Sequence, residues 1–106
     1  MNEEKRQEEQ TEISTRKQDG RVELVGAGGV IGEMTFRPAD GDTWVIDHTY
    51  VDPKYRGKQL AKQLLNLVTD EARAQGKKII PLCSYALAEF KRHAKEYEDL
   101  WDKSGV

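Results

Sequence analysis

The stretch that decides the fold reads Tyr50-Val-Asp-Pro-Lys-Tyr-Arg-Gly-Lys-Gln-Leu-Ala-Lys-Gln-Leu-Leu65. Its first residues are typical of the end of a strand, its middle is a basic turn, and its last part begins an amphipathic helix. The apolar residues that recur at helical spacing are Leu60, Leu64, Leu67, Val68 and Ala72. This pattern predicts a helix from about Lys58 to Gln75 that ends at Gly76.

The basic turn lies where this helix should begin. The first N–H groups of a helix have no partner inside it, and the helix dipole adds partial positive charge at the same end. Lys54, Arg56 and Lys58 crowd that end and are unfavourable there unless an anion binds. A strand, a basic turn and a helix N-terminus in this order predict a phosphate site.

The same stretch resembles a known family. Asp52-Pro-Lys-Tyr-Arg-Gly-Lys-Gln-Leu-Ala61 is similar to the pyrophosphate loop of the GNAT superfamily of acyl-CoA N-acyltransferases, whose pattern is Gln/Arg-x-x-Gly-x-Gly/Ala. Arg56, Gly57, Leu60 and Ala61 match it, whereas Gln59 stands where the second glycine is expected. With His48-Thr49 upstream and Pro81-Leu-Cys-Ser-Tyr85 downstream, the resemblance to small single-domain members covers roughly residues 21–100.

The resemblance implies a fold and a cofactor. The fold is a GNAT-like α+β or α/β domain, in which a mixed twisted sheet has an antiparallel meander and a splayed parallel strand pair that flanks the main helix. The cofactor is acetyl-CoA, with the binding residues Val51, Arg56, Gly57, Lys58, Gln59, Leu60, Ala61 and Ser84. Lys54, Arg56 and Lys58 would add charge toward the 3′-phosphate and the diphosphate, although Lys54 alone is more typical of solvated surface.

Four segments before the helix are predicted to be strands, residues 13–17, 21–25, 30–37 and 43–51, with turns at Asp19-Gly20 and residues 38–41. Val22 and Leu24 should share one face of the second segment. In the third we expect Val30, Met34 and Phe36 on one face and Ile31 on the other. In the fourth, one face carries Trp44, Ile46, His48 and Tyr50, and the other carries Val45, Asp47, Thr49 and Val51. Apolar residues on both faces predict a central strand that is covered on both sides.

Residues 78–83 read as a short strand after the helix. Pro81 cannot donate to a strand ladder and would normally weaken this interpretation. The resemblance resolves the conflict, because it implies a V-shaped opening between this strand and residues 43–51 that admits the pantetheine arm. Ser84 is then expected to cap a helix over residues 85–93, followed by a last helical turn or two within residues 95–102.

Three side chains are candidates for chemistry, Cys83, His48 and Tyr85. Cys83 should lie at the mouth of the opening and at a helix N-terminus that favours the thiolate, as an acyl-accepting nucleophile or a group that lines the thioester pocket. A lone cysteine is otherwise most often a small buried hydrophobe. His48 is a candidate base, or a half-buried histidine bonded to the sheet or to Tyr85. Tyr85 would protonate a departing thiolate, or simply pack at the start of its helix.

Composition bounds the remaining possibilities. The 106 residues predict one domain over residues 12–106 after a polar tail at residues 1–11. The 17 basic and 19 acidic side chains give a net charge of −2, which argues against a nucleic-acid partner. One cysteine excludes an internal disulfide, the two histidines and the cysteine are too widely spaced for a metal site, and His93 is expected only as a helix C-terminal charge. No segment is apolar enough for a membrane span, so we expect a cytoplasmic protein.

The predicted function is acetyl-CoA-dependent N-acetyl transfer to the amine of a small molecule or a peptide, through Cys83 or beside it. The alternative is a non-catalytic acyl-CoA-binding or protein-interaction module. The sequence specifies neither the acceptor nor the oligomeric state.

Overall fold

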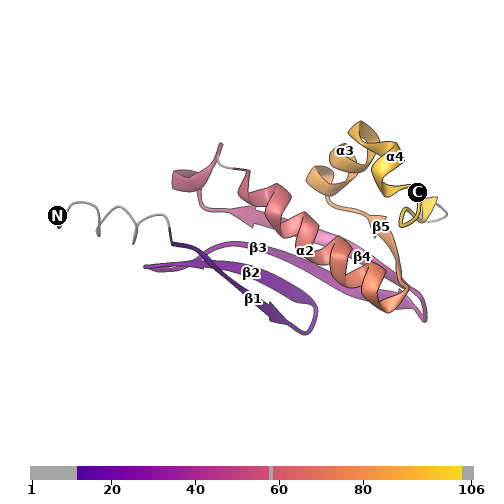
Figure 1. Cartoon of the computed structure of the whole chain (residues 1–106), viewed down its shortest axis with the longest axis horizontal. Helices are drawn as coiled ribbons and strands as arrows, with labels where there is room; N and C mark the ends of the chain where they lie inside the picture. Colours follow the sequence, from indigo (N-terminus) through magenta and orange to yellow (C-terminus); the bar gives the residue numbers. More distant parts are fainter. Residues whose placement is uncertain (1–11, 58, 104–106) are drawn as a thin grey trace.

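Five strands and three helices make up the described part of the chain (Figure 1). The computed structural model describes residues 12–57 and 59–103, so the expected tail at residues 1–11 lies outside the described residues. In chain order the elements are β1 Ser14–Gln18, β2 Arg21–Gly26, β3 Gly29–Asp40, β4 Thr43–Val51, the 3-10 turn η1 Pro53–Tyr55, α2 Leu60–Gln75, β5 Lys78–Pro81, α3 Ser84–Arg92 and α4 Ala94–Tyr97.

The five strands form one mixed sheet with the spatial order β1-β2-β3-β4-β5. The first four pair antiparallel, whereas β5 pairs parallel to β4. A parallel pair needs a crossover connection, and α2 supplies it by running back across the sheet. This arrangement confirms the predicted antiparallel meander followed by a parallel pair around the main helix, and it confirms β4 as an inner strand.

The hydrophobic core lies between one face of the sheet and the helices, which Figure 1 shows on the same side of the sheet. The residues that α2 buries there are Leu60, Leu64, Leu65, Val68, Thr69 and Ala72. The helix ends as predicted, because Gly76 adopts a left-handed conformation (φ +71°) and its N–H bonds to the carbonyl oxygens of Ala72 and Arg73. Its start is two residues later than predicted.

The second face of the sheet carries a row of ion pairs. Arg16 lies 2.7 Å from Glu23, Arg21 lies 3.3 Å from Glu23 and 3.7 Å from Glu33, and His48 lies 3.6 Å from Glu33. Arg16, and then Arg21, hold the pKa of Glu23 below its usual value, against the opposing effect of burial. The expectation that β4 is covered on both sides is therefore correct for residues 43–46, which are all buried, and wrong for Asp47, His48 and Tyr50, which are exposed. An antiparallel sheet can leave one face to water when that face is polar.

A β-bulge reverses the expected orientation of two side chains in β3. Leu24 pairs with Gly32 but Val25 pairs with Val30, so Ile31 is an extra residue on its strand. Ile31 consequently joins the core with 4% of its surface exposed, whereas Val30 is 41% exposed. The strand also continues to Asp40, so it includes most of the segment at residues 38–41 where a turn was expected.

A second bulge lies in β4. Thr35 pairs with His48 and Phe36 pairs with Ile46, which leaves Asp47 unpaired in the ladder. Its carboxylate is held by the Thr35 hydroxyl at 2.6 Å. The sequence predicted that His48 shares the face of Ile46. The bulge shifts the alternation by one residue, so the two side chains lie on opposite faces. Thr49 lies on the helix side instead, and His48 faces the row of ion pairs.

The end of the described chain covers the outer edge of β5. Ile79 N–H donates to the Leu100 carbonyl at 2.7 Å, and Asp102 N–H donates to the Ile79 carbonyl at 2.8 Å. Phe90 of α3 stacks on Tyr97 of α4 with ring centroids 4.4 Å apart. These contacts satisfy backbone groups that a bare edge strand would expose. Within residues 12–57 and 59–103, no helix is both long and apolar enough to span a bilayer.

These contacts make α3 and α4 part of the cooperative core. We expect Phe90→Ala to lower the free energy of unfolding by about 3–5 kcal/mol, because it removes a fully buried ring. Leu82→Ala, at a side chain 59% exposed, should change it by less than about 0.5 kcal/mol. Urea titrations followed by circular dichroism measure both. If Phe90→Ala lowered the free energy of unfolding as little as Leu82→Ala does, the two helices would unfold independently of the sheet.

Candidate active site

The site begins where β4 and β5 separate. Their parallel pairing ends at Ile46 and Pro81, and the next two N–H groups, of Leu82 and Cys83, both donate to the Ile46 carbonyl, at 2.9 and 3.0 Å. β4 continues to Val51, while the other chain turns away into α3. This geometry confirms the splayed strand pair that the sequence predicted around Pro81.

The loop after β4 is held at its start by Asp52. Its N–H donates to the Ile31 carbonyl at 2.8 Å, and its carboxylate accepts from the Lys54 N–H at 2.9 Å. The chain then reaches Gly57, which has φ +83°. A side chain added at Gly57 would meet no atom within 4 Å, so the space in front of this backbone is open.

Gln59 stands directly before α2 in a left-handed conformation (φ +65°, ψ +23°). Among the described residues it is the only one other than glycine with a positive φ. Glycine adopts this conformation without steric cost, which explains physically why the family pattern has glycine here. The Gln59 side chain makes no capping hydrogen bond, so it leaves the first N–H groups of α2 to another partner. Lys58 lies outside the described residues.

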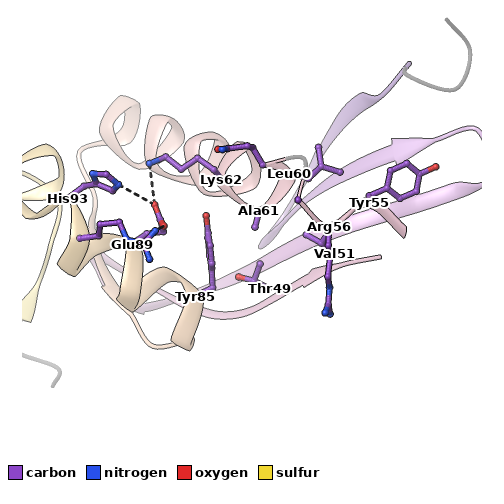
Figure 2. Close-up of a pocket in the computed structure, with 13 residues that line it drawn as sticks. Thr49, Val51, Tyr55, Arg56, Leu60, Ala61, Lys62, Tyr85, Glu89 and His93 are labelled. Carbon is purple, nitrogen blue, oxygen red and sulfur yellow. Dashed lines mark hydrogen bonds and ion pairs between the residues drawn. The ribbon is translucent and has the colours of Figure 1, made fainter. Parts of the chain in front are cut away.

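A pocket of about 570 Å³ lies between this loop, the end of β4 and α3 (Figure 2). Thr49 and Val51 come from β4, and residues 55–57 and 59–62 come from the loop and the first turn of α2. The opposite wall consists of Tyr85, Glu89, Arg92 and His93. The structure thus brings Val51, Tyr85 and the described residues of the predicted loop to one pocket.

Tyr85 points into the pocket beside Thr49 (Figure 2). Burial, followed by the nearby Glu89 charge, raises the pKa of its phenol to about 12. Both effects disfavour the phenolate. Tyr85 therefore remains a neutral hydrogen-bond donor throughout the range of neutral pH.

Cys83 caps α3 and adjoins the pocket. Its sulfur accepts from the Ala86 N–H at 3.4 Å and lies 3.2 Å from the Thr49 hydroxyl. The predicted cap, Ser84, is wrong, because Cys83 has the extended backbone of a cap residue (φ −73°, ψ 149°) and Ser84 is already helical. Ser84 is exposed and is not among the residues that line the pocket.

His48 lies apart from these groups. Its side chain is 54% exposed on the second face of the sheet, where its Nε2 is 3.6 Å from a Glu33 carboxylate oxygen. The sequence placed His48 on a strand that borders the opening, which is correct, but the bulge at Asp47 turns it away from the pocket. The structure therefore does not bring His48 together with Cys83 and Tyr85.

The sequence analysis did not predict the charged cluster that lies at the far end of the pocket. Glu89, with 8% of its side chain exposed, lies 3.3 Å from Lys62, 2.8 Å from Arg92 and 3.8 Å from His93. Burial alone would disfavour the Lys62 ammonium, but its interactions with Tyr97 and Glu89 outweigh this and raise the pKa of Lys62. The sequence does contain a pattern that indicates this cluster, because Tyr85, Glu89 and Arg92 recur at helical spacing and therefore share one face of a helix.

Comparisons with known proteins agree with this geometry. The model of the GCN5-related N-acetyltransferase family matches residues 21–100. The NMR structure of a GCN5-like protein from Staphylococcus aureus has a TM-score of 0.72 at 26% identity, over 87% of this chain and 90% of that one. No curated protein sequence matches significantly.

Two structures with bound ligands share the fold alone, and this chain spans about half of one and a fifth of the other. A GNAT family acetyltransferase from Elizabethkingia anophelis, with acetyl-CoA bound, has a TM-score of 0.55 at 20% identity, over 70% of this chain and 51% of that one. N-acetylglutamate synthase from Neisseria gonorrhoeae, with coenzyme A and N-acetylglutamate, has a TM-score of 0.51 at 20% identity, over 70% and 20%. Because the family model spans most of its length, this chain belongs to the GCN5-related N-acetyltransferases, a family of acyl-CoA N-acyltransferases.

Proposed function

We propose that this enzyme transfers the acetyl group of acetyl-CoA to the amine of a small molecule or a peptide. The observation that carries the proposal is the start of α2, which has no cap from the Gln59 side chain and opens into a pocket bounded by the splayed end of β4. Backbone N–H groups at such a site suit a diphosphate, and the space between strands that have separated suits a narrow arm. The acetyl-CoA bound to a relative of similar fold supports the same reading.

The residues of the loop fit the cofactor. N–H groups of Gly57 and residues 59–61 would hold the diphosphate, and the open space before Gly57 allows its close approach. The Arg56 N–H already donates to the Pro53 carbonyl at 3.3 Å, so Arg56 would act through its guanidinium. Val51 would line the path of the pantetheine arm. Lys58 and Ser84 remain predictions from the sequence, the first because it lies outside the described residues and the second because its side chain is exposed.

Acetyl-CoA, when bound, would supply an activated acetyl thioester. The neutral Tyr85 phenol would donate a hydrogen bond to the departing sulfur. Its proton would remain on the phenol oxygen, because the raised pKa disfavours ionisation. Thr49 lies beside it on β4 and limits the width of the cleft. Stabilising negative charge as it develops on the leaving group lowers the barrier to transfer.

The amine must lose a proton, and His48 is the proposed acceptor. It lies across the sheet from Tyr85, so it would serve an amine that approaches the end of β4 from the second face. Glu33, 3.6 Å away, would orient the imidazole and stabilise its protonated form. The cofactor and the acceptor would then meet at the splayed strands from opposite faces.

Cys83 would act beside the transfer or as its first acceptor. In the second case its sulfur attacks the acetyl carbonyl, the bond to the cofactor sulfur breaks, and the amine later takes the acetyl group from Cys83. The Ala86 N–H and the Thr49 hydroxyl would both donate to the thiolate. These two donors are the structural support for this route.

The first test concerns the loop. Coenzyme A should bind in titration calorimetry, and Gly57→Ala should weaken it about tenfold, since a left-handed alanine costs about 1–2 kcal/mol. Gln59→Gly should tighten binding and raise the free energy of unfolding by about 0.5–1 kcal/mol, because relief of strain exceeds the greater entropy of glycine when unfolded. Gly41→Ala, in open space at a distant turn, is the matched control. No binding at millimolar coenzyme A would end the proposal.

The second test separates binding from turnover. Tyr85→Phe and His48→Ala should each leave the Kd for coenzyme A within about twofold and lower kcat by about tenfold or more. A panel of primary amines with acetyl-CoA, read by release of free thiol, gives the rates. Full turnover of His48→Ala would show that water, rather than His48, takes the amine proton.

The third test concerns Cys83. Acetyl-CoA without an amine should add one acetyl group to the intact protein, and hydroxylamine should remove it. Cys83→Ser should abolish the adduct, whereas Thr49→Val, which keeps the shape but loses the hydroxyl donor, should slow its formation. Intact-protein mass spectrometry follows all three. If the wild-type protein never gains the mass while amines are acetylated, transfer is direct and Cys83 is a structural cap.

A further inference from the structure

The pocket contains a primary amine of the protein itself. Among the described residues that line the pocket, Lys62 is the only lysine. Its Nζ donates to a carboxylate oxygen of Glu89 at 3.3 Å. We propose that Lys62 is an internal acetyl acceptor, which this enzyme modifies with the acetyl-CoA bound in the same pocket. The inference rests on the proposed function, because it assumes that cofactor in this place.

The order of groups along the pocket places Lys62 beyond the acetyl group. The diphosphate would lie at the start of α2, and the thioester sulfur would lie at Tyr85. Figure 2 shows Lys62 and Glu89 on the far side of Tyr85 from Arg56. The charges of Glu89 and Lys62 both act on the Tyr85 phenol, in opposite directions, so the three groups are near one another. The next reactive group past the thioester is therefore the Lys62 amine.

The Lys62 side chain has the freedom to reach the thioester. Its ammonium lies on a flexible four-carbon stem, and 26% of the side chain is exposed. Glu89 does not depend on Lys62 alone, because its second carboxylate oxygen accepts from Arg92 at 2.8 Å. Lys62 can therefore leave this ion pair without leaving the buried carboxylate unpartnered.

Glu89 also supplies the base that the amine needs. Lys62 must lose one proton before it can attack, and the Glu89 oxygen at 3.3 Å can accept it. The neutral amine then attacks the acetyl carbonyl carbon, and the bond between that carbon and the cofactor sulfur breaks. The second amine proton passes to the departing thiolate beside Tyr85. The products are an acetyl-lysine amide and free coenzyme A, and Glu89 returns its proton to water.

The charge state of Lys62 makes this reaction slow at neutral pH. Burial lowers the pKa of Lys62, but its interactions with Tyr97 and Glu89 outweigh burial and raise it. The neutral amine is therefore scarce, and its share rises about tenfold with each unit of pH. The described groups that face Lys62 from α3, its cap and α4 are Tyr85, Glu89, Arg92, His93, Glu96 and Tyr97. We expect modification of Lys62 to be slower than acetyl transfer to Cys83.

The test is incubation of the wild-type protein with saturating acetyl-CoA at alkaline pH, without an added amine. Hydroxylamine then removes any thioester from Cys83, whereas an amide resists it. Intact-protein mass spectrometry should show one remaining acetyl group, and peptide mapping should place it on Lys62. The rate per protein molecule should stay the same when the protein is diluted tenfold, as expected for transfer within one molecule.

Two variants and a second acetyl donor are the controls. Lys62→Arg keeps a positive charge for Glu89 but offers no neutral nitrogen, so the resistant acetyl group should disappear. Lys91→Arg, at an exposed lysine of α3 that does not line the pocket, should keep it in full. With acetyl-CoA, Lys62 should react at least about tenfold faster than Lys91. Acetyl phosphate, which lacks coenzyme A, should remove this preference. Melting curves show whether the variants are folded.

The opposite results would overturn the inference. A resistant acetyl group on Lys91 or Lys58 with none on Lys62 would show that Lys62 is only an ion-pair partner. A rate that falls with dilution would mean transfer between molecules, and an equal preference with acetyl phosphate would mean ordinary chemical acetylation. If coenzyme A binds and added amines are acetylated while Lys62 stays unmodified, only this inference fails. If coenzyme A does not bind, the proposed function fails as well.

Discussion

A single carbonyl oxygen, that of Ile46, ends the pairing between β4 and β5 by accepting from both Leu82 and Cys83. Because the Leu82 and Cys83 N–H groups, which are consecutive, both donate to this one carbonyl, the regular alternation of the ladder is broken at this point. The chain is then free to turn, and α3 starts at once with Cys83 as its cap. The separation of the strands, the direction of α3 and the far wall of the pocket all depend on this one change of partners.

The bulge at Asp47 decides what the opening contains. It stands next to Ile46, so the strand changes its alternation at the same place where it loses its neighbour. Thr49 and Val51 consequently face α3, and His48 faces the ion pairs of the opposite surface. A regular strand would have put the histidine beside Cys83, as the sequence suggested. The two faces of β4 therefore differ at this end of the strand, since one lines the pocket and the other carries an ion pair.

The parts predicted well from the sequence depend on local signals. Neighbouring residues alone determine the apolar period of α2, the glycine that ends it and the basic turn before it. Pro81 likewise indicated where the two parallel strands separate. The bulges could not be predicted, because each depends on how two strands align, and one extra residue reverses every side chain beyond it.

Other misses have different causes. Cys83 replaced Ser84 as the cap because a thiol can accept a hydrogen bond too, a role that sequence rules assign to hydroxyls and carboxylates. The polar face of α3 was readable in its spacing but carried no family motif. The second face of the sheet is not packed against a helix, and ion pairs between neighbouring strands lie on it. The alternation of apolar and polar residues alone does not show such pairs.

The parallel pairing of β4 with β5 also bears on how the chain folds. The antiparallel strands are joined by short turns, so each pair closes with a small loss of chain entropy. β5 meets β4 only after α2 has been traversed, which makes these contacts among the least local in the sheet. The pocket is built on them and is expected to be complete only when this slow, long-range step is over. A cofactor that binds only to the completed pocket would stabilise the product of this final folding step.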